Sequence, residues 1–547
     1  MSVVTATVLS AGSAIDPTYE LVSIDIVKEI NRIPSAQLIL LDGDVAQQSY
    51  AISNETVFEP GKEIEIKLRY EGETEDVTVF KGLVVGHGVS ADVHSSFLTV
   101  ELKDAAVKST LVRKNAIYRQ LTDDAVVSQI ISNNSLEEGS LETTNAEHLE
   151  LVQYYCTDWD FLLSRTEANG LVVVVNDGVI STAQISIAGS AAYTFEYGLS
   201  EIYDFEIEAN AEHQLAGVES RAWDIAAQAL TEAAAAADFS LSQGNLSGAD
   251  LAESLGLSNP NQLASLVPLA PEELQAWSDG RLMRSRLSLI RGRIAIPGLA
   301  DIALLDLIEL AGIGDRFNGT TVVTGLRHRV DNNGWQTDVQ FGLSAKPFAE
   351  RRDLTEVPAA GLLPAVNGLQ IGIVGEFEAD PAEELRVKVI LPGLDPAEGF
   401  VWARLATPDA GLNRGYFFRP EPGDEVVVGF FNDDPRQAVI LGALYSSANP
   451  APEALGELSA DNINKGIVTK KGTTIQFVDD ENASLIIQTT TENKIVLSDD
   501  EEMIEISDQH GNTIKLSADG IEITSASDLK IEASGNVEIT GQQVDVK

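Results

Sequence analysis

Several classes of protein are excluded by what this chain of 547 residues has little of. Cys156 is its one cysteine, so no intrachain disulfide can form, as expected of a chain that folds in a reducing compartment. Lys and Arg number 37 against 84 Asp and Glu, which leaves a formal charge of −47. Such a charge repels phosphate backbones, and we therefore expect no nucleic-acid partner.

Long apolar runs are also scarce. The segment near residues 302–310 is interrupted by Asp306 and Glu309, so we predict no membrane-spanning helix. The N-terminal sequence MSVVTATVLSAGSAIDP lacks the basic and apolar regions of a signal peptide. We expect the chain to be made in the cytoplasm without a signal peptide.

Catalytic signatures are largely missing as well. The sequence contains no Gly-x-Ser-x-Gly elbow, His-Glu-x-x-His pair, Cys-x-x-Cys pair or phosphate-binding Gly-rich loop. We predict no catalytic residue, cofactor or metal site, and we interpret Cys156 as a small buried apolar residue rather than a reactive thiol. The acidic runs 479–481 and 499–502 are interpreted as solvated turns, with a cation site shared by several chains as the alternative. The scattered histidines are interpreted as solvated or core residues: His87, His94, His148, His213, His328 and His510.

What the chain does contain is a C-terminal run of short triplets, each with two apolar residues flanking a charged one. Because side chains alternate across a strand, such a triplet has an apolar inside and a charged outside. One such strand gains roughly 3 to 6 kcal/mol before conformational entropy is subtracted, so several chains must share one core. The predicted core residues are Ile514, Leu516, Ile521, Ile523, Leu529, Ile531, Val537, Ile539, Val544 and Val546.

An intertwined trimeric β-helix, in which three chains each supply one face, satisfies this pattern. The alternative is a single-chain β-solenoid, against which we note that Lys547 follows the last triplet without the terminal cap that solenoids require. Upstream of the shorter repeat, triplets begin at Ile475, Leu485, Ile495, Ile504 and Ile514, with a spacing near ten residues. That wider spacing indicates looser, hairpin-like wrapping.

The rest of the chain is also mainly strand-like. Helices are predicted after Thr122 and Thr157, where acidic residues follow a capping hydroxyl, with Gly170 as a stop. Alanine-rich residues 226–239 are expected to be helical, and Pro271 is expected to open a helix that runs towards Ser288. The predicted fold class is mainly β: a hub of two related β-barrels at 1–355 with a helical insertion near 225–290, a linker at 356–367, an OB-fold barrel at 368–446, a neck at 447–470 and a trimeric β-helix needle at 471–547.

The predicted OB barrel contains several aromatic residues, which we expect to pack in its core rather than to stack on nucleotides. They are Phe400, Trp402, Tyr416, Phe417 and Phe430.

Residues 417–452, FFRPEPGDEVVVGFFNDDPRQAVILGALYSSANPAP, closely resemble the OB-barrel signature of the VgrG-type spike proteins of contractile injection systems. This family includes type VI secretion spikes, phage tail hubs and spikes, the Photorhabdus virulence cassette and the antifeeding prophage. The order and spacing of the turns at 421–425 and 432–435 carry the resemblance. The N-terminal half is similar to the hub of the same family at residues 30–36, 41–44, 153–165, 328 and 334–337.

The resemblance implies a homotrimeric spike that adapts a hexameric inner tube to a trimeric needle and pierces the target envelope mechanically. Its implied partners are the tube protein, baseplate proteins, effector cargo, the target membrane in transient contact, and a PAAR-repeat tip protein docked at Val544, Asp545, Val546 and Lys547. The spike would be assembled at the baseplate of a phage tail-like particle and then become extracellular or injected. The rivals are a spike with its own envelope-degrading hydrolase activity and a receptor-binding tailspike. The sequence leaves open whether the particle is extracellular, phage-borne or a cell-anchored type VI system.

Overall fold

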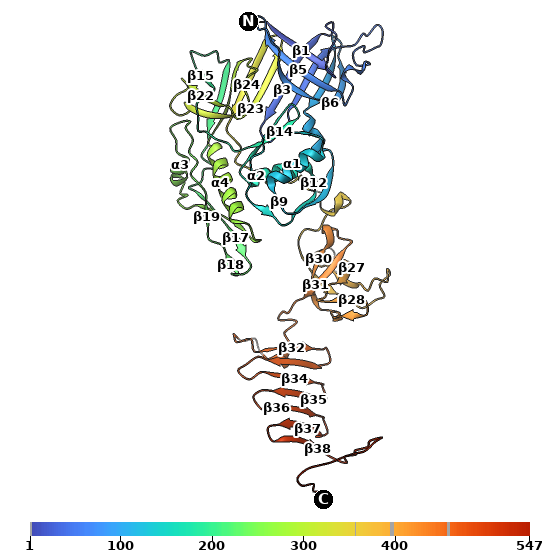
Figure 1. Ribbon diagram of the computed structural model, residues 1–547. Helices are drawn as coiled ribbons and strands as arrows, with labels where there is room; N and C mark the ends of the chain where they lie inside the picture. The colour runs from blue at the N-terminus through green and yellow to red at the C-terminus, as the bar shows by residue number, and fades with distance from the viewer. Residues whose placement is uncertain (1–2, 356, 394–398, 457–459) are drawn as a thin grey trace. The chain divides into compact units, whose positions relative to one another are not determined.

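The computed structural model describes residues 3–355, 357–393, 399–456 and 460–547. The fold is mainly β and divides into two compact units, Met1–Glu356 and Val357–Lys547 (Figure 1). Residue 356, where the linker is predicted to begin, and residues 457–459 of the predicted neck lie outside the described residues. Within those residues, no helix has both the length and the apolar character needed to cross a membrane.

One thirteen-stranded sheet runs through the first unit. Strands β3 and β23 pair antiparallel, from Ile24 opposite Val330 to Glu29 opposite Gly325, and so join segments that are far apart in the sequence. The two β regions predicted as related barrels therefore share one sheet. Along the sheet the strands are β16 (Asp204–Ala209), β21 (Ile290–Pro297), β24 (Gly334–Phe341), β23 (Gly319–Asp331), β3 (Leu21–Glu29), β4 (Ser35–Leu41), β7 (Ser96–Lys103), β6 (Val77–Ala91), β5 (Glu63–Tyr70), β1 (Val4–Ser10) and β2 (Ser13–Ala14), with β22 (Leu307–Ala311) on β23 and β15 (Tyr193–Glu196) on β22.

Each β region has its own apolar core. Ile26, Leu38 and Phe80 belong to the core of the first region, and Ile308, Val323 and Phe341 belong to that of the second. All six side chains are fully buried or nearly so. The hub is thus a rigid β scaffold that carries helices and hairpins as additions.

The helices begin and end mainly where the sequence predicts. Helix α1 (Asp123–Asn133) follows Thr122, and α2 (Asp158–Ala168) follows Thr157, whose Oγ1 accepts a hydrogen bond from the Asp160 N–H at 3.1 Å. Gly170 has φ +68° just after α2, the left-handed conformation that ends helices. Pro271 opens α4 (Pro271–Leu287), and a short helix, α3, spans Gly248–Ser254.

Smaller strands surround the helices (Figure 1). Strands β13 and β14 pair with each other and β14 also pairs with β10, while β8 and β12 form a hairpin-like pair and β9 pairs with β11. Their bounds are β8 (Arg113–Tyr118), β9 (Leu121–Thr122), β10 (Glu137–Glu138), β11 (Glu147–His148), β12 (Leu151–Thr157), β13 (Val172–Asn176) and β14 (Val179–Ala183).

The alanine-rich segment at residues 226–239 is not the predicted helix. It contains β18 (Ala229–Leu230) and β19 (Ala234–Ala235), which pair with β17 (Val218–Asp224), as does β20 (Asn261–Ser265). A short alanine-rich helix is only marginally stable by propensity, because helices in proteins depend on burying an apolar face. Here the segment instead receives hydrogen bonds from α4, where Ser278 Oγ donates to the Ala234 carbonyl at 2.8 Å.

The second unit begins with a closed five-stranded barrel of the OB type. Its core is made of small aliphatic residues, among them Val389, Ala403, Val426 and Val428. The barrel strands are β25 (Gln370–Val374), β26 (Val387–Ile390), β27 (Phe400–Leu405), β30 (Glu425–Phe430) and β31 (Ala438–Ala443), and a separate pair is formed by β28 (Ala410–Gly411) and β29 (Arg414–Gly415).

The prediction that aromatic residues fill this barrel is wrong for all but Phe430, which packs partly against the core. Phe400, Tyr416 and Phe417 are exposed. Because side chains alternate along β27, Phe400 and Trp402 lie on the face opposite the buried Ala403. Cations cover these two rings instead: Lys388 Nζ lies 4.2 Å from the Phe400 ring and Arg386 Cζ 6.0 Å from that of Trp402.

The C-terminal segment forms a seven-stranded antiparallel meander in which every strand pairs with the next. This confirms the hairpin-like wrapping and differs from a β-solenoid, whose coils stack in parallel. The meander continues one triplet further than the period-ten spacing predicts, since β38 contains Ile521. Its strands are β32 (Asn464–Val468), β33 (Thr474–Val478), β34 (Ser484–Gln488), β35 (Lys494–Ser498), β36 (Met503–Ser507), β37 (Thr513–Ser517) and β38 (Gly520–Thr524).

Among the described residues, no strand follows Thr524. The predicted strands at the triplets that begin at Leu529, Val537 and Val544 are therefore not present in the single chain. A strand needs a neighbour for its backbone hydrogen bonds, and the single chain offers none there.

Candidate functional site

The apolar face of the C-terminal meander is the candidate assembly surface. In each of β33 to β38, the second and fourth residues of the strand point to this face, because residues two apart share a side. Antiparallel register then aligns them across the sheet, for example Ile495 opposite Ile506 and Leu497 opposite Ile504. The result is two columns of aliphatic and aromatic side chains. The first column is Ile467, Ile475, Ile487, Ile495, Ile506, Ile514 and Ile523, and the second is Phe477, Leu485, Leu497, Ile504, Leu516 and Ile521.

Most of these side chains are exposed in the single chain, from 37% at Ile487 to 72% at Ile521. Contiguous apolar surfaces of this length are rare on monomeric soluble proteins and mark interaction sites. This face therefore has the composition and exposure of an interaction surface.

The opposite face of the meander is polar over β36 to β38, whereas Ile486 and Val496 lie on it in β34 and β35. Glu505, Lys515 and Glu522 are cross-strand neighbours on β36, β37 and β38, so charges of alternating sign follow one another down the sheet. Opposite charges on facing positions stabilise antiparallel strands by a few tenths of a kcal/mol up to about 1 kcal/mol. Over these three strands the sheet therefore has one charged face and one apolar face.

The structure brings together only part of the predicted core. Ile514, Leu516, Ile521 and Ile523 lie in the two columns, together with earlier residues from Ile467 to Ile506 that the triplet repeat did not assign to the core. The ten-residue spacing was the signal for them, since each period holds one strand and one turn. Six predicted core residues, Leu529, Ile531, Val537, Ile539, Val544 and Val546, and the predicted docking residues Asp545 and Lys547 are exposed beyond β38, and their roles stay predictions.

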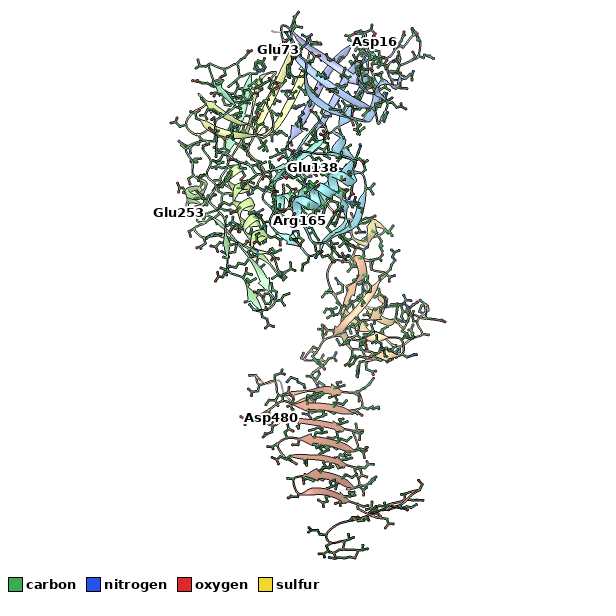
Figure 2. The ribbon with its side chains drawn as sticks, viewed as in Figure 1. Asp16, Glu73, Glu138, Arg165, Glu253 and Asp480 are labelled. Carbon is green, nitrogen blue, oxygen red and sulfur yellow. The ribbon has the colours of Figure 1, made fainter. Side chains whose placement is uncertain are left out.

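In the hub, the motif residue Arg165 lies at the centre of a buried ionic network (Figure 2). Its guanidinium donates to both Asp123 carboxylate oxygens at 2.7 and 2.8 Å, and to Glu273 Oε1 of α4 at 3.4 Å. Asn169 and His148 also reach Asp123, at 2.8 and 3.1 Å. Burial opposes ionisation of Asp123, but these hydrogen bonds outweigh it and hold the pKa of its carboxyl below the usual range. The network ties α1 and α2 to α4.

A second motif residue, Asn31, fixes the turn between β3 and β4 to the same region. Its backbone has φ +60°, and its side chain donates to Glu167 Oε1 at 3.0 Å and accepts from the Val173 N–H at 2.7 Å. Glu167 accepts two further hydrogen bonds at 2.6 Å each, from Arg284 Nη2 and the Phe348 N–H. Asn31 and Glu167 thus hold four segments of the hub together.

Other residues of the hub motifs are also engaged inside the fold. Buried Gln153 donates to the Cys156 carbonyl and to Asp158 Oδ1, at 3.2 and 3.0 Å. His328 Nδ1 lies 3.0 Å from Thr337 Oγ1, and burial lowers the pKa of this histidine to about 3. Cys156 is buried as predicted, and burial raises the pKa of its thiol. These buried residues of the hub motifs therefore act in folding and stability, whereas Leu41 and Tyr154 of the same motifs are exposed.

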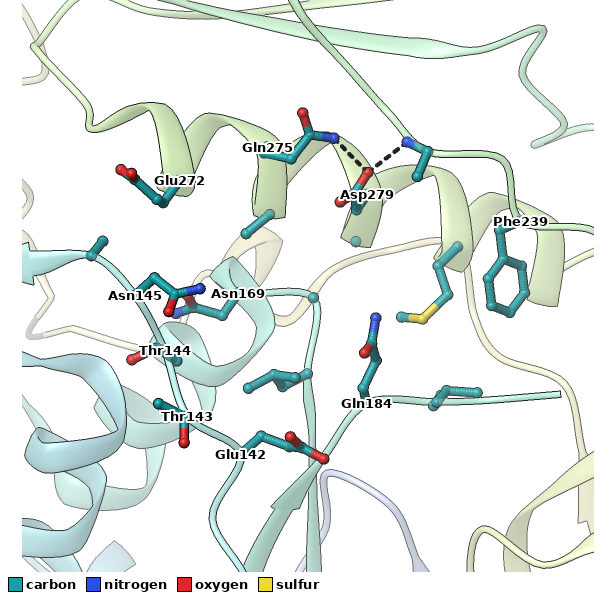
Figure 3. A pocket seen from close by; sticks show the side chains of 18 of the residues that line it. Glu142, Thr143, Thr144, Asn145, Asn169, Gln184, Phe239, Glu272, Gln275 and Asp279 are labelled. Carbon is teal, nitrogen blue, oxygen red and sulfur yellow. Dashed lines mark hydrogen bonds between the residues drawn. The ribbon is translucent and has the colours of Figure 1, made fainter. Parts of the chain in front are cut away.

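A cleft lies beside α4 of the hub. The rival hydrolase function would need a pair of facing carboxylates in such a cleft. The cleft encloses about 450 Å³ between α4 and residues 142–146 (Figure 3). Asp279 on its wall accepts hydrogen bonds from Gln275 Nε2 at 2.9 Å and the Ala237 N–H at 2.7 Å, so it joins α4 to the segment after β19. Within the described ranges, no three His, Cys, Asp or Glu side chains gather in a way that could hold a metal ion.

Family comparisons cover nearly the whole chain. Residues 370–445 match the type VI secretion system/phage-baseplate injector OB domain, and residues 484–547 match the phage baseplate V C-terminal trimerisation domain. Residues 1–332, more than half of the chain, match the Alg8 N-terminal domain. The chain belongs to the Alg8 N-terminal domain family and to the VgrG-type spike proteins. Its OB barrel thus lies in a secretion and baseplate injector domain, and its C-terminal sheet lies largely in a trimerisation domain.

Individual relatives of this spike match over shorter stretches. It is 44% identical over 54 residues to the type VI secretion system spike protein VgrG3 of Vibrio cholerae, which is 10% of this chain and 5% of that protein. It is 24% identical over 250 residues to the spike protein VgrG1a of Pseudomonas aeruginosa, 42% of this chain and 39% of that protein. The chain therefore spans less than half the length of either relative.

Two solved structures are also similar. A tail protein from Neisseria meningitidis has a TM-score of 0.46 and 12% identity, covering 63% of this chain and 98% of its own. A chain of the half-lidded Francisella PdpA-VgrG complex has a TM-score of 0.41 and 9% identity, covering 96% and 88%.

Proposed function

We propose that this VgrG-type protein is the homotrimeric hub and spike of a contractile injection system, in which it joins a hexameric inner tube to a three-sided needle. The observation that carries the proposal is the pair of exposed apolar columns on one face of the meander. Three copies that turn this face inwards would form a closed prism with a dry core and three charged outer faces.

The energetics favour such a prism. Removing one half-exposed Ile or Leu side chain from water contributes roughly 1 kcal/mol, so about a dozen positions contribute roughly 10 kcal/mol per chain. Association costs about 4 to 15 kcal/mol in lost freedom of motion. The combined burial from three chains offsets the cost of association. In a single chain the apolar face stays exposed to water.

The hub is proposed to meet the inner tube. Two β regions per chain and three chains would present six contacts, which matches the symmetry of a hexameric ring. Support for this role comes from the two cores that share one sheet, because such a scaffold keeps both regions in a fixed relation.

The needle is proposed to act mechanically rather than by catalysis, and to carry a tip protein or effector cargo on its end. Contraction of a surrounding sheath would concentrate force on a narrow prism whose backbone is fully hydrogen-bonded. The spike is proposed to be made in the cytoplasm, assembled at a baseplate and then released or injected.

Electron microscopy of particles from cells with and without this chain tests the role. Particles from wild-type cells should show a central spike below the baseplate, and particles without the chain should lack it or fail to assemble. Complete particles with an unchanged spike in its absence would contradict the proposal.

A further inference from the structure

The turns of the C-terminal meander alternate between its two edges, because the chain reverses direction at each one. Turns after β33, β35 and β37 lie at one edge, called here the acidic edge: residues 479–483, 499–502 and 518–519. Turns after β32, β34 and β36 lie at the other, called here the cationic edge: residues 469–473, 489–493 and 508–512.

The acidic edge concentrates charge of one sign. Figure 2 shows Asp480 at this edge, and Asn482 Nδ2 donates to Asp500 Oδ1 at 2.8 Å, so two successive acidic turns touch. Within the part of the chain that the structure describes, Lys465 is the one cation paired with this group, through Asp479 at 2.6 Å. The carboxylates at the edge are Asp479, Asp480, Glu481, Asp499, Asp500, Glu501, Glu502 and Asp519.

The cationic edge carries the complementary groups, alongside two carboxylates in its turns, Glu492 and Asp508. Lys470 and Lys471 lie in its first turn, Lys494 begins β35 beside the second turn, and His510 lies in the third. Lys470 pairs with Glu421 at 2.8 Å, whereas Lys471 is exposed and forms no ion pair with the described residues. Apart from Lys465 and Lys515, every Lys and His of the meander therefore lies at this edge.

We infer that the acidic edge of one protomer docks against the cationic edge of the next, and that this contact determines how the three sheets join. The inference rests on the proposed homotrimer. Around a threefold axis every copy is related to the next by the same rotation, so unlike edges must meet at each corner of the prism. Two acidic edges never face each other in such an assembly.

The heights of the turns fit this contact. Strands in a sheet are about 4.8 Å apart, so turn 479–483 of one copy lies about one strand spacing from the heights of turns 469–473 and 489–493 of its neighbour. Lys471 then comes within reach of Asp480 and Glu481 across the corner. Lys494 and His510 fall beside turn 499–502 in the same way.

The same geometry bears on the cation site that the acidic runs suggested as an alternative. With the apolar columns facing the axis, the three copies of each acidic turn lie at three separate corners and do not converge. The acidic runs are thus assigned to protein contacts between neighbours.

The test is a charge reversal on the full chain: Lys471→Glu, Glu481→Lys and the two combined. Within one chain these residues are separated by β33 (Thr474–Val478), five residues that span roughly 17 Å. That separation exceeds the Debye length of about 8 Å at physiological salt, so one reversed charge cannot compensate the other inside the same chain. The combined variant also keeps the wild-type net charge and is its own matched control.

At low salt each single reversal should lower the melting temperature of the trimer by a few degrees, and the combined variant should restore it. The differences should largely disappear at 1 M NaCl, where the Debye length falls to about 3 Å. Additive losses in the combined variant, or losses that persist at high salt, would overturn the edge contact. A monomeric wild-type chain would instead overturn the proposed trimer, so the two failures are distinguishable.

Discussion

Ile506 lies directly opposite Ile514 on adjacent strands of the meander, and both side chains are exposed on the same face. A neighbouring sheet that covers one of them must cover the other, because their Cβ atoms are about 5 Å apart. This pair therefore makes the apolar face open to a direct test.

Replacing Ile506 by Asp should prevent trimer assembly, because a trimer would bury three carboxylates close to its axis. Burying one unpaired carboxylate costs several kcal/mol, which exceeds the free energy gained by burying one apolar side chain. Size-exclusion chromatography measures the result. The matched control is Glu505→Gln on the outer face of the same strand, which should stay trimeric. An Ile506→Asp variant that assembles like the control would contradict the inward orientation of the columns.

Replacing both Ile523 and Ile531 by Asp should also prevent trimer assembly, because it would place buried charges in the tip region of the prism. Ile523 lies on β38, whereas Ile531 lies beyond the last strand of the single chain. If residues after Thr524 form strands only between chains, Ile531→Asp alone should lower the protection of backbone amides at 525–547 against hydrogen exchange in the trimer. Fast exchange of that segment in the unmodified trimer would show that it does not pair there.

The hub network predicts a pH-dependent stability. The pKa of Asp123 is lowered in the folded state, so its contribution is present above the unfolded pKa of about 3.9 and is lost as pH falls through the folded value. At pH 7, Asp123→Asn should destabilise the hub by about 3 kcal/mol, because Arg165 loses the nearer and more deeply buried of its two carboxylate partners. The difference from wild type should shrink as the pH falls below about 4. Thermal unfolding monitored by Trp fluorescence measures it, and a pH-independent difference would contradict an ionic role.

Removal of the hub should separate needle formation from tube attachment. A chain lacking residues 1–354 is expected to remain a soluble trimer, because its OB barrel and meander have their own cores and faces. It should no longer co-sediment with assembled tube protein. Equal co-sedimentation of the shortened and intact chains would place the tube contact outside the hub.

Deletion of residues 542–547 should abolish binding of a PAAR-repeat tip protein and leave the trimer intact. The final residues would present unpaired backbone groups at the end of the prism, and open edges of this kind are usually covered. The matched control, Lys547→Ala, retains that backbone and should still bind the tip protein in a pull-down. Unchanged binding by the shortened chain would rule out docking at this end.

Sequence patterns predicted the local structure well where one periodicity dominated. The period-ten triplets gave the strands that begin near Ile475 and Leu485, and capping residues such as Thr157 placed the helices. Failures came from packing that a local pattern does not encode. The strands at 226–239 depend on β17 and α4, and the outward position of Phe400 depends on the small aliphatic core behind it. The charged edges could not be seen in sequence, because acidic runs twenty residues apart meet only once the strands have folded into a meander.

The mass of the purified full-length chain in solution tests the central claim most directly. Multi-angle light scattering is expected to give a single species at about three times the chain mass of 58.6 kDa. The mass should stay constant on dilution through the micromolar range, since a shared prism core resists dissociation. A monodisperse species at the mass of one chain would contradict the account.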